Sequence, residues 1–349
     1  MLRQYTSVKV TPKAEKSLKN GHPWVFSDEI TEVNGRYENG DIVDAFSAKD
    51  RYLGSGFIND NSKIRVRVIS RNANDKFDEA FYKRRLKYAV DYRKTVMGND
   101  FSCCRLIFGE ADQFPGLTVD RFSDVLSVQI ACLGIERIKD MLYRSLLQVL
   151  CEYGVNISAI YERNDLAVRS IEGLSQYKGF YEAEGLKKDL SGHVIITENN
   201  IKYDVDYING QKTGFFLDQK YNRAAVAKIA KGKTVLDCFT HTGAFALNAA
   251  KGGAVSVTAV DISHDALECA KNNARLNGID NMDFVAADVF DLLTEMSKSG
   301  RGPYDFIILD PPAFTKSSGT LKNAIRGYKE INLKAMKLLP RGGYLATFS

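Results

Sequence analysis

Residues 234–245 read Thr-Val-Leu-Asp-Cys-Phe-Thr-His-Thr-Gly-Ala-Phe, and this stretch predicts the fold of the carboxyl-terminal half. A short apolar run ends at Asp237, a loop of small residues turns at Gly243, and residues 244–250 favour a helix. An open α/β sheet forms a nucleoside pocket at its carboxyl edge from such a strand, acidic residue, tight loop and helix. A dinucleotide site would need three glycines in the pattern Gly-x-Gly-x-x-Gly, and the loop has one. The stretch therefore predicts a nucleoside site without a cradle for a pyrophosphate.

The same alternation of strand and helix continues to the end of the sequence. Apolar runs predict five strands, at residues 235–236, 256–260, 284–286, 306–309 and 343–348. Helical patterns lie between them, at residues 244–251, 264–276, about 290–297 and 322–339. Residues 194–207 alternate before this region and predict a hairpin that turns at Asn199-Asn200. We therefore expect a Rossmann-like α/β domain with a parallel, doubly wound sheet over residues 181–349.

Three aspartates fall at the ends of the first three predicted strands: Asp237, Asp261 and Asp288. Asp261 follows the first of them by 24 residues, near the roughly 20-residue step at which a carboxylate meets ribose hydroxyls. Asp288 is placed to accept a hydrogen bond from an adenine amine. One such aspartate is most often a helix cap, but three beside a glycine-poor loop favour a bound nucleoside. A nucleoside without a diphosphate in this fold indicates S-adenosylmethionine.

The fourth predicted strand ends in Asp310-Pro311-Pro312-Ala313-Phe314. Two successive prolines stiffen the chain where a strand becomes a loop. The aspartate and the rigid carbonyl groups then present acceptors to a planar amine, and Phe314 is a candidate for stacking on a base. Most Asp-Pro turns have no catalytic role, but the position beside the cofactor strand favours one here.

The first 72 residues predict a small β-barrel, because short apolar runs alternate with turn signals such as Asn34-Gly35. In residues 63–68, Lys63, Arg65 and Arg67 alternate with aliphatic residues and share one face of a strand. An RNA-binding barrel presents such a face, and so does any half-exposed strand. Residues 1–105 carry 20 Lys and Arg against 14 Asp and Glu, which suits a polyanionic partner and an ordinary solvated surface equally.

Residues 73–180 predict a central α+β domain. Residues 77–96 favour a basic helix that contains Arg84 and Arg85, two further candidates for RNA contact. Strands are expected at residues 117–119, 125–130 and 158–162, with a helix at 135–150. Residues 163–192 hold four glycines and little periodicity, which predicts a connector.

Composition excludes several classes of protein. No apolar run approaches the roughly 20 residues of a membrane span, and the first residues lack the apolar segment of a secretion signal. The six cysteines include no Cys-x-x-Cys pair, and the four histidines are dispersed. We therefore expect a cytoplasmic protein with reduced thiols, no membrane contact and no metal site.

The motifs in residues 237–245, 310–314 and 213–219 together resemble the class I methyltransferases of ribosomal RNA. More narrowly, the chain resembles the bacterial large-subunit RNA cytosine-C5 methyltransferases that carry an amino-terminal PUA domain. Gly21-His-Pro-Trp-Val-Phe is similar to the start of that PUA domain, and residues 105–122 are similar to the central domain of the group. The resemblance covers almost the whole chain and implies ribosomal RNA as the partner. It leaves open whether the protein forms a homodimer.

The resemblance also implies roles for single residues. Asp237 would lie at the methionine end of the cofactor, Asp261 at the ribose and Asp288 at the adenine. Arg223 would bind the cofactor carboxylate from a segment that covers the pocket. The implied cofactor-binding residues are Phe216, Gln219, Arg223, Asp237, Phe239, Gly243, Asp261, Ile262, Asp288 and Asp310. The implied catalytic residue is Asp310, with Pro311, Pro312 and Phe314 at the substrate.

One feature departs from the resembled group. C5 of cytosine reacts only after a thiolate has added at C6, and in this group the cysteine follows the fifth strand. Here the fifth predicted strand ends at Ser349, no cysteine lies near Asp310, and Cys238 is expected to be a buried core residue. We therefore expect a chain that is truncated before its nucleophile. The alternatives are methylation of a guanine or adenine nitrogen through Asp310-Pro311-Pro312, and a non-catalytic RNA-binding remnant.

Overall fold

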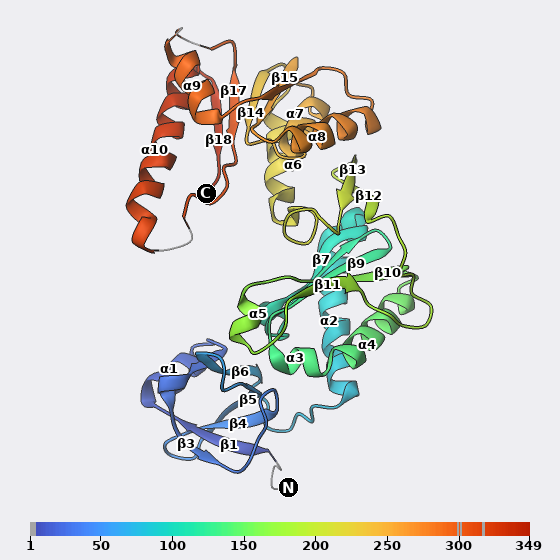
Figure 1. The fold of residues 1–349 in the computed structure, drawn as a ribbon, viewed down its shortest axis with the longest axis vertical. Coiled ribbons are helices and arrows are strands. Elements are labelled where there is room, and N and C mark those ends of the chain that lie inside the picture. The colour runs from blue at the N-terminus through green and yellow to red at the C-terminus, as the bar shows by residue number, and fades with distance from the viewer. Residues whose placement is uncertain (1–4, 299, 301, 316–317) are drawn as a thin grey trace. The chain divides into compact units, whose positions relative to one another are not determined.

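The computed structural model describes residues 5–298, 300, 302–315 and 318–349, and it divides the chain into two compact units. Unit 1 contains residues 1–194 and 205–215, and unit 2 contains residues 195–204 and 216–349. Each unit is described by itself below (Figure 1). None of the helices in the described ranges is long and apolar enough to cross a membrane.

Unit 1 begins with a six-stranded sheet, which we call the sheet domain. Its strands run in the order β2-β6-β5-β4-β1-β3. Here β1 is parallel to β4, and the other neighbours are antiparallel. The elements are β1 (Thr6–Val10), α1 (Pro12–Lys19), β2 (Trp24–Phe26), β3 (Ile30–Asn34), β4 (Ile42–Ser47), β5 (Tyr52–Ile58) and β6 (Ile64–Ser70). This agrees with the β domain expected for the first 72 residues.

A second, five-stranded sheet follows in unit 1, in the order β11-β10-β9-β8-β7. Its strands are β7 (Cys103–Phe108), β8 (Leu117–Phe122), β9 (Val125–Ile130), β10 (Ala159–Asn164) and β11 (Tyr177–Phe180). The helices are α2 (Glu79–Met97), α3 (Leu133–Arg137), α4 (Lys139–Glu152) and α5 (Val168–Ile171). One core joins α2 and α4 to one face of this sheet, through residues such as Leu86, Val119 and Leu146. Figure 1 shows both helices beside the sheet.

Two expectations for this region were wrong in detail. The helix expected at residues 135–150 is two helices, because the backbone breaks at Ile138, where φ is −114°. Residues 163–192 are more than a connector, since they form α5 and the edge strand β11, which pairs antiparallel with β10. Their four-residue elements are too short to produce a recognisable hydrophobic period.

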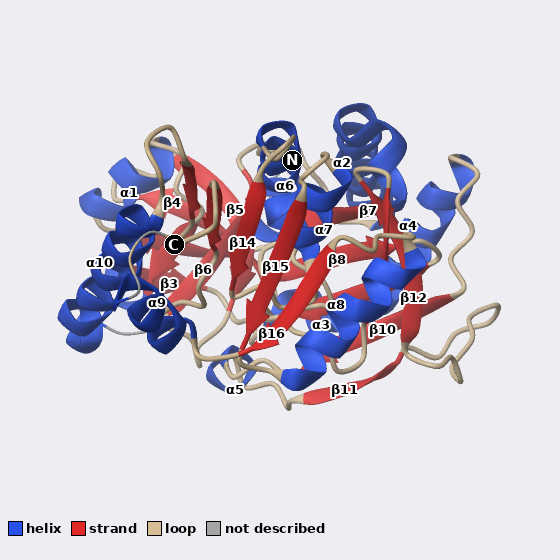
Figure 2. Cartoon of the chain, turned by 90° about the horizontal axis from the view of Figure 1, so that it is seen from above, coloured by secondary structure: helices blue, strands red, loops and turns tan. Residues whose placement is uncertain are grey.

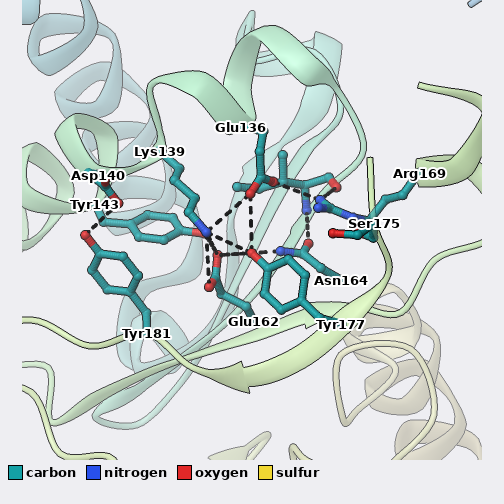
Figure 3. Close-up of polar contacts among 11 residues, drawn as sticks. Glu136, Lys139, Asp140, Tyr143, Glu162, Asn164, Arg169, Ser175, Tyr177 and Tyr181 are labelled. Atoms are coloured by element: carbon teal, nitrogen blue, oxygen red, sulfur yellow. Dashed lines mark hydrogen bonds and ion pairs between the residues drawn. The ribbon is translucent and has the colours of Figure 1, made fainter. Parts of the chain in front are cut away.

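A buried polar network holds this segment in place (Figure 3). Lys139 Nζ lies 3.1 Å from Glu162 Oε1 and 2.8 Å from the Tyr177 hydroxyl, which joins α4 to β10 and β11. Arg169, on α5, is buried and donates to Glu136 Oε2 at 2.9 Å. Tertiary ion pairs and hydrogen bonds therefore order a stretch whose own sequence shows little pattern.

The sheet domain and the central sheet are packed together within unit 1. Arg67 and Glu172 are both buried, and Arg67 Nη2 donates to Glu172 Oε1 at 2.7 Å. The Asn59 amide donates to the same carboxylate at 3.0 Å. Gly134 leaves no room for a side chain, because a Cβ atom there would lie 2.2 Å from the ring of Phe57. The two sheets thus share a close, polar interface.

Unit 2 contains the expected parallel sheet, in the order β16-β15-β14-β17-β18. The strands are β14 (Thr234–Cys238), β15 (Ser256–Asp261), β16 (Met282–Ala286), β17 (Phe306–Leu309) and β18 (Tyr344–Thr347), all parallel. The helices are α6 (Lys220–Ile229), α7 (Ala244–Lys251), α8 (His264–Leu276), α9 (Val289–Lys298) and α10 (Leu321–Leu338). Figure 2 shows β14, β15 and β16 running side by side. The strand order places β14 at the centre, so its carboxyl end is the topological switch point of the sheet.

Helices cover both faces of this sheet. One core contains Val226 of α6 and Ala246 of α7 against Val257, and the other contains Leu293 of α9 and Ile331 of α10 against Ile307. The expected hairpin is also present, as β12 (His193–Glu198) and β13 (Ile201–Asp206). Asn199 and Asn200 turn it with φ of 53° and 61°, the left-handed conformation that asparagine tolerates better than most residues.

Candidate functional site

Asp237 is the penultimate residue of the central strand β14 and is completely buried. Its Oδ2 atom accepts hydrogen bonds from Thr240 Oγ1 at 2.6 Å and from the Ala246 backbone N–H at 3.0 Å. Its Oδ1 atom is buried without a hydrogen-bond partner among the described residues. Burial raises the pKa of Asp237 to about 7, and the nearby charges of Asp310 and Asp261 act in the same direction. The carboxyl group therefore favours a ligand that brings a donor or a positive charge.

The loop between β14 and α7 is held in an unusual backbone conformation. Phe239 and His241 have φ values of 62° and 52°, which is uncommon for residues with side chains. Gly243 has φ of 79°, and a Cβ atom there would lie 2.9 Å from Ala270 Cβ on α8. Glycine therefore lets α7 and α8 approach each other. Contact of Phe239 and Gly243 with a cofactor stays a prediction.

Asp261 lies at the end of the neighbouring strand β15 and fixes this loop. Its Oδ2 accepts from the His241 backbone N–H at 2.8 Å, and its Oδ1 accepts from the Ser263 N–H at 3.0 Å. The next residue, Ile262, exposes 69% of its surface. A carboxylate and an exposed aliphatic side chain thus lie together beyond β15, which suits the polar and apolar parts of a nucleoside.

Asp288 follows β16 and precedes α9. It is exposed, and its Oδ1 accepts from the backbone N–H groups of Phe290 at 2.7 Å and Asp291 at 3.3 Å. These contacts make it a cap at the start of α9, as expected for a single strand-end aspartate. Its position still completes a row, since β14, β15 and β16 are neighbours and Asp237, Asp261 and Asp288 each lie within two residues of a strand's carboxyl end.

Asp310 follows β17, on the other side of β14, and its backbone N–H donates to the Cys238 carbonyl at 3.4 Å. Gln219 Nε2 lies 3.5 Å from Asp310 Oδ1, and Asn222 Nδ2 donates to Gln219 Oε1 at 2.6 Å. The ring of Phe216 stands edge-on to His241, with 5.5 Å between centroids. The segment that carries Phe216 and Gln219 therefore contacts the carboxyl edge of the sheet. Sequence reasoning missed Asn222.

Arg223 is placed differently from its expected role. It is buried, and its Nε and Nη2 atoms donate to Glu198 at 2.7 and 2.8 Å. Nη2 also donates to the Phe216 carbonyl at 2.9 Å. The arginine thus fixes the segment that carries Phe216, and its contact with a cofactor carboxylate stays a prediction. No sequence pattern pointed to Glu198 as its partner.

The substrate residues expected after Asp310 differ in exposure. Pro311 is buried and Pro312 is exposed. Phe314 packs against Tyr328, with 4.4 Å between ring centroids, and against Phe290 at 5.6 Å. Phe314 therefore belongs to an aromatic cluster with α9 and α10. Its stacking on a base stays a prediction.

The five residues expected to contact RNA all lie in unit 1. Lys63 and Arg84 are exposed, whereas Arg65 and Arg85 are half-buried and form ion pairs with Asp60 and Asp75. Arg67 is the buried partner of Glu172. The shared strand face expected for Lys63, Arg65 and Arg67 is therefore partly covered by the central sheet. RNA contact by these residues stays a prediction.

Two further kinds of site concern the cysteines and the acidic groups: a cysteine nucleophile and a metal centre. Cys238 is buried in the core against α9 and α10, as expected, and burial raises the pKa of its thiol far above the usual range. It therefore has none of the thiolate character of a nucleophile. Within the part of the chain that the structure describes, no group of His, Cys, Asp and Glu residues is suited to a metal ion.

S-adenosylmethionine fits this constellation, because it carries an ammonium group, a sulfonium charge, a ribose and an adenine. The unpartnered Oδ1 of Asp237 lacks the donor that an amine provides. Asp261 and Ile262 offer a carboxylate and an apolar surface one strand away, where a ribose and a base would follow. Asp237, Asp261 and Ile262 would thus hold the cofactor across the carboxyl ends of neighbouring strands of the sheet.

Two known protein families match this chain, one near its start and one over its second half. Residues 8–71 match the family described as PUA-like domain, and residues 174–348 match the family described as S-adenosylmethionine-dependent methyltransferase. The ribosomal RNA large subunit methyltransferase I of Aeromonas salmonicida is 42% identical over 96% of this chain and 83% of its own length. The protein of that name from Shewanella denitrificans is 42% identical over 98% of this chain and 85% of its own length.

Solved structures show the same fold. A putative methyltransferase complexed with SAH has a TM-score of 0.79 at 24% identity, over 98% of this chain and 86% of that one. A putative SAM-dependent methyltransferase from Streptococcus mutans has a TM-score of 0.72 at 24% identity, over 95% of this chain and 90% of that one.

Proposed function

We propose that this chain, which belongs to the S-adenosylmethionine-dependent methyltransferase family, methylates a base of large-subunit ribosomal RNA. The observation that carries the proposal is the row of aspartates at the ends of three neighbouring parallel strands, with one carboxylate oxygen unpartnered. The substrate class is supported by relatives named ribosomal RNA large subunit methyltransferase I, which this chain matches over 83–85% of their length. Ribosomal RNA modification would take place in the cytoplasm.

The described residues would hold the cofactor as follows. The ionised carboxylate of Asp237 would bind its amine, Asp261 would accept from the ribose hydroxyls, and Asp288 would accept from the adenine amine through the oxygen that does not cap α9. Bound S-adenosylmethionine supplies an electrophilic methyl group. Gln219, whose Nε2 lies 3.5 Å from Asp310 Oδ1, would orient this carboxylate toward the methyl acceptor. A base must leave its stack to reach such a site.

The proposed acceptor atom is C5 of cytosine. That reaction requires a thiolate to add at C6, after which C5 takes the methyl group, loses its proton and the thiolate leaves. Cys238 is too deeply buried to act in this way. The Asp310-Pro311-Pro312 motif supports a second candidate, a nitrogen of guanine or adenine, since a ring nitrogen or amine has its own lone pair and needs only an acceptor such as Asp310 for its proton.

One experiment distinguishes these outcomes. The 349-residue chain is incubated with methyl-labelled S-adenosylmethionine and unmodified large-subunit ribosomal RNA, and the RNA is digested to nucleosides and analysed by mass spectrometry. Label in 5-methylcytidine supports the first acceptor, and label in an N-methylated purine supports the second. An Asp261→Ala variant is the control for a transfer that depends on this site. Binding of the cofactor and RNA without label in any nucleoside would contradict the nitrogen acceptor, which needs no thiolate. The proposal as a whole fails if the wild-type chain binds no S-adenosylmethionine or no large-subunit ribosomal RNA.

A further inference from the structure

The central sheet of unit 1 has a second face, opposite α2 and α4. Side chains alternate between the two faces of a strand, and Leu117 and Val119 of β8 belong to the core beneath the helices. Thr118 therefore points to the other face. Phe108 of β7 and Gln129 of β9 are its direct partners across the strands. The three side chains form one row on three neighbouring strands, which we call the Phe108 row.

A hollow of about 330 Å³ lies over this row. Glu110 and Ala111 line it after β7, and Leu166 lines it after β10. This volume is at the lower end of the roughly 300 to 1,000 Å³ of small-ligand sites. It matches a group of the size of a nucleobase with part of its sugar better than a larger cofactor. No residue of the aspartate row in unit 2 takes part in it.

The lining combines an open aromatic ring with groups that can form hydrogen bonds. Phe108 exposes 56% of its surface, and the Arg105 guanidinium lies 5.3 Å from the centre of its ring. Within the described ranges, the Thr118 hydroxyl and the Gln129 amide have no hydrogen-bond partner, and both are only partly buried. An amide and a hydroxyl offer donors and acceptors to the edge of a base, while the ring offers a stacking surface.

The surroundings hold these groups rigidly. Arg105 Nε and Nη2 donate to Asp120 at 2.7 and 2.9 Å, which fixes the guanidinium beside Phe108. The loop that carries Leu166 is fixed by Arg169, which is buried and donates to the Ile130 carbonyl at 2.6 Å. Preorganised groups lose little conformational entropy when a ligand binds.

Glu110, which lines the hollow, also contacts the sheet domain. Glu110 Oε1 accepts from Trp24 Nε1 at 2.9 Å and lies 3.5 Å from Arg67 Nη1. Arg67 shares its positive charge between Glu110 and Glu172, so it balances the negative charge of Glu110 in part.

From the Phe108 row and its hollow we propose that the central domain contains a nucleobase site, which binds an unpaired base of the RNA substrate apart from the base that is methylated. The base stacks on Phe108 and forms hydrogen bonds with Gln129 and Thr118. Single-stranded RNA is often bound on a sheet in this way, with aromatic residues stacking bases and polar side chains bonding their edges. This inference rests on the proposed function only in taking RNA as the ligand.

Trp24 provides the measurement, because it is the sole tryptophan of the chain and its indole contacts Glu110 in the lining of the hollow. The full chain is titrated with a ten-nucleotide single-stranded RNA, with a duplex of the same sequence, and with free cytidine and adenosine. We expect the single strand to change the fluorescence of Trp24 at concentrations where the duplex and the nucleosides do not. Equal responses to the free nucleosides would overturn the assignment to RNA.

The test variant is Phe108→Ala, and the matched control is Tyr88→Ala. Tyr88 exposes 62% of its surface in the same unit, but on α2, at the other face of the sheet. Loss of one stacked base should weaken binding of the single strand by about 5- to 150-fold, whereas the control should stay within about twofold. Gln129→Leu should reduce the preference among homopolymeric RNAs. Unchanged affinity of Phe108→Ala, with the fold verified by circular dichroism, would overturn the inference.

A methyl-transfer assay distinguishes failure of this inference from failure of the proposed function. If the wild-type chain labels ribosomal RNA, Phe108→Ala should raise the KM for RNA and leave the KM for S-adenosylmethionine unchanged. An unchanged KM for RNA would refute the site while the methyltransferase assignment stands. If the wild-type chain labels no RNA, the Trp24 titration of wild type and Phe108→Ala still decides whether the Phe108 row binds a base.

Discussion

Replacing Asp237 by asparagine should make the stability of unit 2 less dependent on pH. The carboxyl group is completely buried, and burial raises its pKa to about 7, compared with about 3.9 in an unfolded chain. The folded state therefore binds this proton more tightly than the unfolded state does. The contribution to stability is greatest at acidic pH and is lost as the pH rises from about 4 through about 7. Asparagine has nearly the same shape and never ionises.

The magnitude follows from the two pKa values. Each pH unit between them corresponds to about 1.4 kcal/mol, so between pH 5 and pH 8 the wild-type group loses about 2.5 kcal/mol of stability. Asparagine also leaves an N–H group facing the position of the unpartnered Oδ1, at a cost of about 1–3 kcal/mol. That cost is the same at both pH values and cancels in the comparison. A change of 1 kcal/mol shifts Tm by roughly 2–4 °C in a domain of about 150 residues or more.

The assay is differential scanning calorimetry of wild type and Asp237→Asn at pH 5, 6, 7 and 8, without cofactor. The Tm of the variant relative to wild type should increase by roughly 5–10 °C from pH 5 to pH 8. Other titrating groups are common to both proteins, so the difference reports this carboxyl together with its electrostatic coupling to Asp310 and Asp261. A relative Tm that is constant with pH, or that falls, would refute the assignment of a raised pKa to Asp237.

Three further predictions concern other charged groups. Asp261→Ala should weaken S-adenosylmethionine binding by about 10- to 150-fold, since a charge-assisted hydrogen bond contributes about 1.5–3 kcal/mol. Isothermal titration calorimetry measures the Kd, and an unchanged Kd would contradict a role of Asp261 in cofactor binding. Arg223→Met should destabilise unit 2 by about 3–5 kcal/mol, because it leaves Glu198 buried and unpaired, and the double variant with Glu198→Met should regain most of the Tm. Arg67→Met should leave Glu172 without its ion pair at the interface of the sheet domain and so increase cleavage of unit 1 by a protease. Resistance to the protease equal to that of wild type would contradict a structural role of Arg67.

The parallel sheet of unit 2 could be predicted from sequence because its signals are local. Each strand is a short apolar run, each strand end is marked by an aspartate or a turn, and the helices between them have clear periods. The position of Asp237 at the switch point follows from this alternation, since the strand order of a doubly wound sheet reverses beside its first strand. Backbone direction then places Asp261 and Asp288 on the same edge.

The partners of buried charges could not be predicted, because they are distant in sequence. Period 2 placed Arg67 on the same strand face as Lys63, but the face is partly covered by a domain that contributes Glu172 more than 100 residues later. Arg223 was assigned to a cofactor carboxylate, whereas its observed partner is Glu198 in the hairpin. Charge alone does not tell an arginine that binds a ligand from one that binds a neighbouring strand.

The distribution of charge along the chain indicates which part suits RNA and which part suits S-adenosylmethionine. The carboxyl edge of the methyltransferase sheet carries Asp237, Asp261, Asp288 and Asp310 at successive strand ends, and this potential repels a phosphate backbone. A cofactor with an ammonium and a sulfonium charge neutralises part of it, but a polyanion gains nothing there. We therefore expect the proposed affinity for RNA to come mainly from the basic first third of the chain. An uncharged base, extruded from its stack, is the part of the RNA that this edge can accept, so raising the salt concentration should weaken RNA binding far more than it weakens binding of S-adenosylmethionine.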